Sequence, residues 1–144
     1  MNVDVFHTTL QKTGEWLRDI RQLLEWDTDQ RAYLALRAVL HTLRDRLPVI
    51  EAVHLGSQLP MLVRGFYYEG WHMAGKPTKD RSVQEFASHV QAGLPPQFPV
   101  DPLTAARGVL EILWEKLDPG EFTKVMKHLP EPLRSLGPEA TPSS

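Results

Sequence analysis

The stretch Leu59-Pro-Met-Leu-Val-Arg-Gly-Phe-Tyr-Tyr-Glu-Gly-Trp71 lies near the middle of the 144-residue chain and holds two of its three tyrosines. On a helix, Phe66 and Gly70 share one face with Val63, whereas Tyr67 and Trp71 share the next face. One face can pack between two segments of the chain, and the other face then remains available for other contacts. We therefore predict that this stretch is the junction on which two halves of the molecule pack.

Two halves are visible because residues 15–64 align with residues 85–134 without a gap. The alignment contains 12 identities in 50 pairs, whereas ordinary residue frequencies give about three. Most identities fall at positions with the spacing of a helix core, including Leu40, Leu43 and Leu47 and the residues 70 positions later. The pattern predicts duplication of a helical packing unit, with repeat one over about 8–71 and repeat two over about 82–136.

Helix signals follow one another through the first half. Thr8-Thr-Leu-Gln11 has the form of a capping box, and an amphipathic helix should run from there to about Glu25. Thr28 or Asp29 can cap the next helix. Pro48 fits the start of a third helix, and Pro60 should kink it or open a fourth that runs to Gly70. The residues expected to face the core are Leu10, Thr13, Leu17, Ile20 and Leu24 on the first helix, and Tyr33, Leu36, Leu40, Leu43 and Leu47 on the second.

The second half repeats these signals. Ser82-Val-Gln-Glu85 is another capping box, Asp101-Pro102 is a helix start with Asp as the cap, and Asp118-Pro119 opens the next helix. The expected core row is Leu103, Ala106, Leu110, Leu113 and Leu117. Together the two halves predict an all-α fold, a bundle of two pseudo-symmetric units of three to four helices each.

Composition restricts the class of protein. The formal net charge is −2 and the pI is about 6.3, so no chain-wide basic field attracts nucleic acid. Arg31, Arg37, Arg44 and Arg46 make a short basic patch that aspartates interrupt, and we expect a solvated helix face there. The chain has no cysteine, no signal-peptide pattern and no apolar run of membrane length. We expect a cytoplasmic protein without membrane or nucleic-acid partners, one domain over 1–136 and a disordered tail over 137–144.

Several blocks occur in the same order as in a known family. They are Thr8-Thr-Leu-Gln-Lys-Thr-Gly-Glu-Trp-Leu17, Arg31-Ala-Tyr-Leu-Ala-Leu-Arg-Ala-Val-Leu-His41, Arg44-Asp-Arg-Leu-Pro48 and the Leu59–Trp71 stretch. Over about residues 6–136 the chain resembles the bacterial domain-of-unknown-function family twenty-two sixty-seven. The resemblance implies a small, duplicated, all-helical cytoplasmic protein, and it implies no activity and no catalytic residues.

Metal and catalytic patterns are weak. Glu51-Ala-Val-His54 and Glu69-Gly-Trp-His72 have the Glu-x-x-His spacing of carboxylate-bridged dimetal bundles, with Glu15 and Glu25 as possible further ligands. Gly70 interrupts the helix under the second run, so surface His–Glu pairs are the better interpretation. Neither a nucleophile elbow nor a phosphate-binding glycine loop occurs. We therefore expect no cofactor and no metal, although Tyr67, Tyr68, Glu69 and His72 could supply an acid and a base.

One polar relation recurs in both halves. Glu51 and Arg64 are matched by Glu121 and Arg134. Glu near a helix N-terminus suits the helix dipole, and an Arg 13 residues later could reach back to it. We predict structural ion pairs that fix the angle between the last two helices of each half. The alternative is an anion site near the helix N-termini.

The aromatic block is the strongest candidate for a site. Its side chains are either core, with tyrosine hydroxyls bonded to the backbone, or a partner or dimer surface. The residues concerned are Tyr67, Tyr68, Glu69, Trp71 and His72. The favoured function is a non-catalytic interaction or scaffold module with a homodimer or protein partner. The alternative is a protein that binds a metal or small ligand near Tyr67–His72, conceivably an enzyme.

Overall fold

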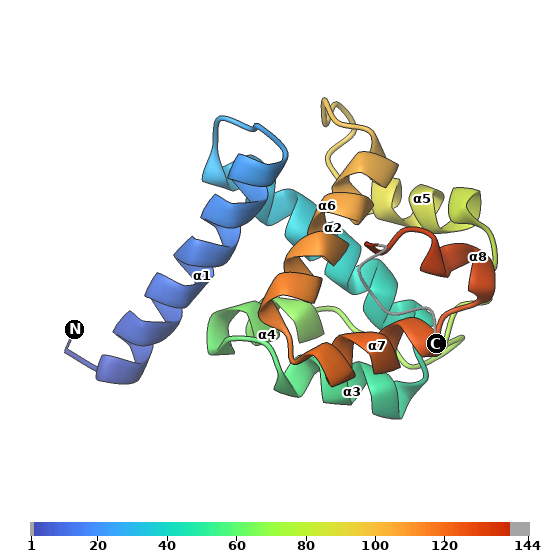
Figure 1. Cartoon of the computed structure of the whole chain (residues 1–144), viewed down its shortest axis with the longest axis horizontal. Helices are drawn as coiled ribbons and strands as arrows, with labels where there is room; N and C mark the ends of the chain where they lie inside the picture. Colours follow the sequence, from blue (N-terminus) through green and yellow to red (C-terminus); the bar gives the residue numbers. More distant parts are fainter. Residues whose placement is uncertain (1, 139–144) are drawn as a thin grey trace.

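The computed structural model describes residues 2–138, and over that range it contains α-helices and no β-strand, as the sequence predicts (Figure 1). The helices are α1 (Asp4–Leu23), α2 (Asp29–Arg46), α3 (Val49–Ser57), α4 (Met61–Tyr68), α5 (Val83–Ala92), α6 (Pro102–Lys116), α7 (Pro119–Lys127) and α8 (Glu131–Arg134). The tail expected to be disordered lies outside the described residues from position 139 onward.

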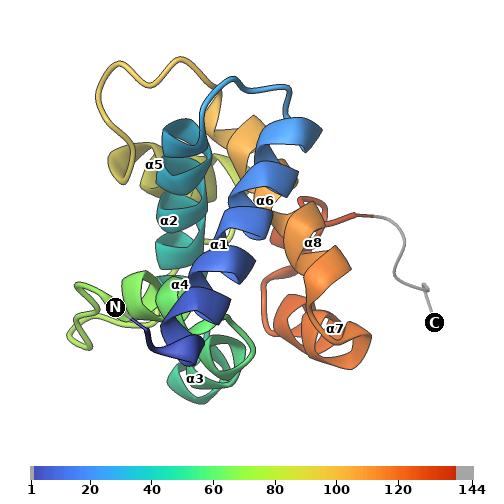
Figure 2. The ribbon, with the colours of Figure 1, turned by 90° about the vertical axis from the view of Figure 1, so that its left-hand side faces the viewer.

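Helix α2 is the centre of the bundle, because α1, α3, α4, α5 and α6 all pack against it. Its neighbour α6 also contacts α1, α5 and α7. Helix α1 runs along one side of the molecule, and its N-terminal end extends past the end of α2 (Figures 1 and 2). The two helices that carry the leucine rows therefore lie at the middle of the fold.

The leucine rows are buried as predicted. Leu40, Leu43, Leu110 and Leu113 are each at most 1 % exposed, and the ends of both rows, Leu47 and Leu117, are also buried. The N-terminal members of the rows, Tyr33 and Leu103, are only partly buried. Small side chains let α2 lie close to its neighbours, because Ala32, Ala35, Ala38, Ala105 and Ala106 are buried among the leucines.

Most predicted helix starts are confirmed. The Thr28 hydroxyl accepts the backbone N–H of Arg31, and the Asp101 carboxylate accepts that of Thr104. Ser82 and Glu85 form the complete capping box. These caps satisfy backbone N–H donors that the first helical turn leaves unpaired. Each cap involves residues only three positions apart, so the sequence alone can predict it.

The expected capping box at Thr8–Gln11 is wrong. Helix α1 begins at Asp4, with Val3 as its N-cap, so the four residues lie inside the helix. Thr9 serves a tertiary contact instead, since its hydroxyl accepts the backbone N–H of Leu62 at 2.9 Å. That bond ties α1 to the first turn of α4.

The face of α1 that packs inward also differs from the expected one. Its buried residues are Thr9, Thr13, Trp16 and Ile20, whereas Leu10 is 58 % exposed and Leu17 and Leu24 are half-buried. The large Trp16 ring takes the inward position, which turns Leu10 outward. Helix α1 ends at Leu23 because Glu25 adopts a left-handed conformation (φ 57°) and the backbone N–H of Trp26 bonds back to Arg21.

The starts of the last two helices of each half are consistent with the 70-residue alignment, whereas those of the first two are not. Helices α3 and α7 begin at Val49 and Pro119, and helices α4 and α8 begin at Met61 and Glu131. Helix α5 starts nine residues later than the alignment with α1 requires, because residue 4 of α1 corresponds to residue 74. Duplication as the origin of this order stays a prediction.

Truncating either leucine row should destabilise the protein. We expect Leu40→Ala and Leu110→Ala each to lower the free energy of unfolding by roughly 2–5 kcal/mol, because each leaves a cavity among fully packed neighbours. Ile50→Ala is the control, since this side chain is 69 % exposed and its truncation should change stability by no more than about 0.5 kcal/mol. Urea unfolding followed by circular dichroism measures all three, and losses below about 1 kcal/mol at both core sites would contradict the assignment.

Candidate functional site

The tyrosines of the aromatic block serve packing. Tyr67 is fully buried, and its hydroxyl donates to the carbonyl oxygen of Ala52 at 2.6 Å. Burial raises the pKa of Tyr67 well above its usual range. Tyr68 is half-buried and meets Tyr67 edge-on, with ring centroids 5.0 Å apart. The core interpretation of these two residues therefore describes them better than the acid–base one.

Gly56 on α3 makes this packing possible. A Cβ atom at that position would overlap the Tyr68 ring and lie 3.1 Å from the ring of Tyr67. Glycine therefore lets α4 place both tyrosines directly against α3. Ser57, the next residue, bonds its hydroxyl to the carbonyl oxygen of His54 at 2.6 Å and closes the end of α3.

Arg44 is the residue that the sequence interpretation misplaced. It is 3 % exposed rather than solvated. Its Nη1 donates to the carbonyl oxygens of Tyr67 (2.7 Å) and Glu69 (3.0 Å), and its Nε pairs with the Asp45 carboxylate at 2.8 Å. The guanidinium also lies over the Trp71 ring, 5.8 Å from the centroid. A signal existed, because Arg44 follows Leu40 by four residues and therefore shares its face.

The neighbours of Arg44 hold the segment that joins the halves. Arg46 donates from Nε to the carbonyl oxygen of Asp80 at 2.6 Å, and the backbone N–H of Thr78 donates to the carbonyl oxygen of Asp45 at 2.8 Å. The Asp80 carboxylate is buried and lies 2.6 Å from Nδ1 of His89 on α5. The C-terminal turn of α2 thus fixes both ends of the linker.

The polar members of the aromatic block remain at the surface. Helix α4 ends at Tyr68 rather than at Gly70, which has a φ of 71°. Glu69 and His72 are exposed, and Glu69 pairs with Arg37 at 3.0 Å. Trp71 is half-buried and stacks on Tyr68, with centroids 5.7 Å apart. Because Glu69 and His72 lie beyond the helix, their spacing no longer places them on one helical face.

The expected ion pair between Glu51 and Arg64 is not among the ion pairs of residues 2–138. Arg64 instead donates to the carbonyl oxygens of Gly56 (3.0 Å) and Leu59 (2.9 Å) at the C-terminal end of α3. Glu51 lies in the first turn of α3, at the other end. Arg134 likewise donates to the carbonyl oxygens of Leu129 and Lys127 rather than to Glu121. Both arginines join the last two helices of their half, by bonding carbonyls that the helix end leaves unpaired.

Glu51 has a different set of partners, drawn from both halves. Its carboxylate lies 3.8 Å from His54 on α3, and 3.7 Å and 3.9 Å from His128 and Lys124 beside α7. These contacts join α3 to α7. Over the described part of the chain, no group of three or more His, Asp or Glu side chains has an arrangement that could hold a metal ion.

An exposed apolar groove between α1 and α4 was not predicted. It is defined here as the α1/α4 face and consists of Phe6, Leu10, Met61 and Leu62, with exposed fractions of 45, 58, 45 and 41 %. The groove has a volume of about 590 Å³, and its lining contains no Lys, Arg, Asp or Glu. The sequence pattern assigns Leu10 to the core and therefore does not predict this surface. Its i, i+4 spacing from Phe6 was the available signal.

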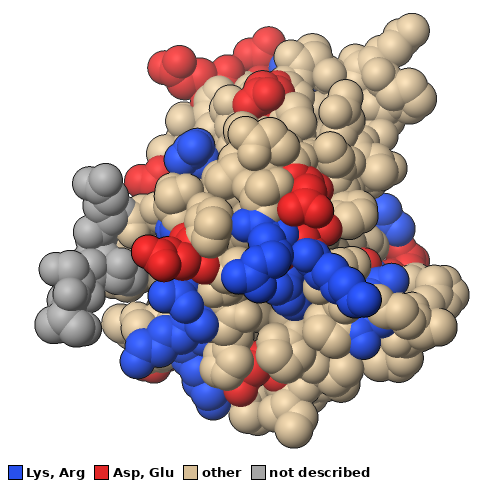
Figure 3. Space-filling model, turned by 90° about the vertical axis from the view of Figure 1, so that its right-hand side faces the viewer, with Lys and Arg blue, Asp and Glu red and all other residues tan. Residues whose placement is uncertain are grey.

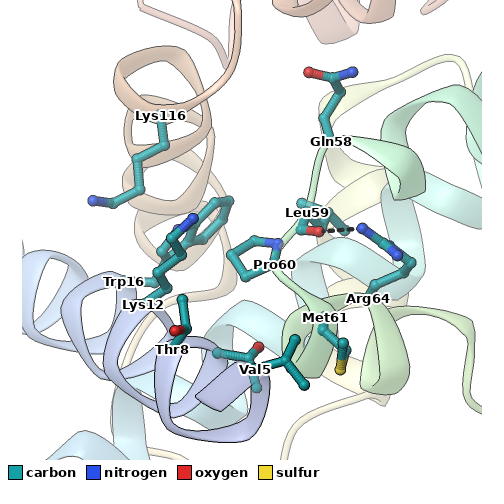
Figure 4. Close-up of a pocket in the computed structure, with 11 residues that line it drawn as sticks. Val5, Thr8, Lys12, Trp16, Gln58, Leu59, Pro60, Met61, Arg64 and Lys116 are labelled. Carbon is teal, nitrogen blue, oxygen red and sulfur yellow. Dashed lines mark hydrogen bonds between the residues drawn. The ribbon is translucent and has the colours of Figure 1, made fainter.

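A second hollow lies on the other side of α1, between α1, the end of α6 and the loop before α4. We call it the α1/α6 cleft, and its volume is about 400 Å³ (Figure 4). Trp16 and Pro60 lie in its walls, and three cations surround them, Lys12, Arg64 and Lys116. Its lining contains no carboxylate.

Charge elsewhere is mixed. On the side where α5 and α8 lie, Lys and Arg gather in the middle of the face, with Asp and Glu on both flanks (Figure 3). Because Arg44 is buried, the basic patch expected on α2 also has one exposed arginine fewer. The visible face therefore carries no broad field of one sign.

Arg44 should matter far more for stability than Arg37 on the same helix. Arg44→Met leaves two carbonyl oxygens and a carboxylate without their partner, and we expect the free energy of unfolding to fall by about 3–5 kcal/mol. Arg37→Met breaks a pair whose side chains are 33 % and 63 % exposed, and it should cost at most about 1 kcal/mol. Equal effects of the two substitutions in urea unfolding would contradict the role given to Arg44.

Ionisation of Tyr67 should weaken the fold in alkali. The unfolded chain loses this proton near pH 10, whereas the folded chain holds it because burial raises the pKa. Its contribution is therefore complete below pH 10 and falls as the pH rises above about 10. In the Tyr67→Phe variant, the free energy of unfolding should therefore decrease less steeply with pH between about pH 9 and 11. An unchanged slope, matching that of Tyr68→Phe, would show that Tyr67 is not the group concerned.

The comparisons with known proteins give a family and no activity. No curated protein matches the chain. None of the described helices is long and apolar enough to cross a membrane. The model of the family described as "Uncharacterized conserved protein (DUF2267)" matches residues 13–136, which include the leucine rows, the aromatic block and Arg44. The chain belongs to the DUF2267 family.

Proposed function

We propose that this protein is a non-catalytic interaction module, and that it self-associates through the α1/α4 face. The observation that carries the proposal is the exposure of Phe6, Leu10, Met61 and Leu62 around a groove whose lining contains no Lys, Arg, Asp or Glu. The largest apolar patch on a protein surface is often a binding site. The surface predicted around Tyr67 supports the proposal less well, because Tyr67 is buried and its hydroxyl is bonded.

The exposed apolar area suits an interface of ordinary size. Val3, the N-cap of α1, is 38 % exposed and adds apolar surface three residues before Phe6, although it does not line the groove. At about 150–200 Å² for a large apolar side chain, the exposed parts of these five residues amount to roughly 400 Å². One side of a standard interface buries about 800 Å², of which somewhat more than half is apolar. The α1/α4 face can therefore supply the apolar part of one such side.

A second copy of the chain is the occupant that the geometry favours. A two-fold contact brings the same patch of both copies together, so like charges near the axis would repel one another. The lining of this groove contains no Lys, Arg, Asp or Glu, and His7 is its titratable side chain. The face also contains a ridge, Phe6 and Leu10 on α1, beside a hollow. No atom lies within 4 Å of the Cβ position at Gly65 in that hollow. Each ridge can thus enter the groove of the other copy.

We also propose where the protein is located, which partners it lacks and which second function it could have. We propose a cytoplasmic location because a chain without cysteine suits a reducing compartment. We propose no nucleic-acid partner because the formal net charge is −2 and both acidic and basic side chains lie on the face shown in Figure 3. The second candidate function is small-ligand binding, and it is favoured by the cation-lined α1/α6 cleft rather than by the Tyr67–His72 block.

Sedimentation equilibrium of the full chain tests self-association. We expect a mass of twice 16.4 kDa at high concentration, and Leu10→Glu should weaken the dimer at least about thirtyfold because it buries a charge at the centre of the contact. Ile50→Glu is the matched control: Ile50 is 69 % exposed, lies on α3 outside the groove, and should leave the dimer intact.

Circular dichroism of both variants is the folding control, and both should keep the helical signal of the unmodified chain. A monomer at every concentration contradicts the proposal. So does a dimer that Leu10→Glu leaves unchanged or that Ile50→Glu disrupts instead, since the contact then lies elsewhere on the molecule.

A further inference from the structure

The α1/α6 cleft brings together cations that come from three helices. Lys12 lies on α1, Arg64 on α4 and Lys116 at the end of α6. Figure 4 shows Lys12 and Lys116 on one side of the hollow, and Gln58 and Arg64 on the other, with Trp16 and Pro60 between them. No carboxylate lines the cleft, so cations outnumber anions among its lining side chains.

The three cations are not equally available. Lys116 is already paired with Asp19 at 2.7 Å, and its Nζ lies 5.9 Å from the centre of the Trp16 ring. Arg64 uses Nε and Nη2 on carbonyl oxygens, which fixes its guanidinium plane and leaves Nη1. Lys12 is exposed and makes no hydrogen bond or ion pair within residues 2–138. Lys12 and the remaining edge of Arg64 are therefore the groups left for a ligand.

The walls of the cleft have a second chemical character. Trp16 is only 5 % exposed but lines the cleft, and the Pro60 ring lies beside it in Figure 4. Thr8 lies one helical turn before Lys12 on the same face of α1 and adds a hydroxyl. A volume of about 400 Å³ is within the range of small-molecule sites. The cleft thus combines an aromatic wall, a hydroxyl and unpaired positive charge.

We propose that the α1/α6 cleft binds a small organic anion, a carboxylate or phosphate ester carried on a flat apolar body. The apolar body lies on Pro60 and the exposed edge of Trp16, and the anionic group lies at Lys12 with the Thr8 hydroxyl. Arg64 faces the ligand from the opposite wall. The cleft adjoins the α1/α4 face, since Thr9 and Met61 line both hollows, but the residues assigned here to the ligand line the cleft alone.

Nuclear magnetic resonance of the ¹⁵N-labelled full chain tests the site. The probe is 1-naphthyl phosphate, compared with inorganic phosphate and with uncharged 1-naphthol. We expect the phosphate ester to shift the indole N–H signal of Trp16 in a saturable way, and each comparison compound to bind about tenfold more weakly or worse. Lys12→Gln should weaken binding of the ester about tenfold. Lys127→Gln, which removes an exposed lysine on α7 outside the cleft, should have no effect.

Several results overturn the proposal. The Trp16 signal does not move, or the two lysine variants bind equally well, or inorganic phosphate or 1-naphthol binds as tightly as the ester. Shifts confined to Leu10 and Leu62 place the probe in the α1/α4 groove and also overturn it. Repeating the titration on Leu10→Glu separates this outcome from failure of self-association, because the cleft should still bind the ester in that variant.

Discussion

The contact between the buried Arg44 guanidinium and the backbone after α4 fixes the direction in which the chain leaves the first half of this protein. One side chain of the central helix bonds the carbonyl oxygens of Tyr67 and Glu69 and covers the Trp71 ring. A buried charge is costly unless it is paired and hydrogen-bonded, and Asp45 completes the pairing. The chain must therefore leave α4 in this one direction, which places the linker along α2 and α5.

The same device closes the short helices elsewhere. Arg64 and Arg134 bond carbonyl oxygens where α3 and α7 end, and Arg107 reaches the carbonyl oxygen of Ser135 at 3.3 Å. Helices of eight or nine residues expose a large share of unpaired backbone groups. A planar guanidinium can satisfy several of them from a neighbouring element. Arginine thus contributes here to helix packing as well as to surface charge.

Both candidate binding surfaces arise from one asymmetry between the halves. Helix α1 spans Asp4–Leu23, whereas α5 spans only Val83–Ala92. The first turns of α1 have no helical counterpart 70 residues later, so they extend beyond the matched core (Figure 2). Phe6 and Leu10 on one side form the ridge of the α1/α4 face. Thr8 and Lys12 on the other side line the α1/α6 cleft.

The sequence by itself determined the helices, most of their caps and the two leucine rows, because these depend on spacing and on residues within one turn of each other. Ser82–Glu85 and the rows through Leu40 and Leu110 are examples. Only the tertiary structure decided which face of α1 turns inward, and that Arg44 is buried whereas Leu10 is exposed. Those outcomes depend on neighbours far away in the chain: the carbonyl oxygens that Arg44 reaches belong to residues 67 and 69. Side-chain spacing within one helix cannot specify which distant groups will lie beside it.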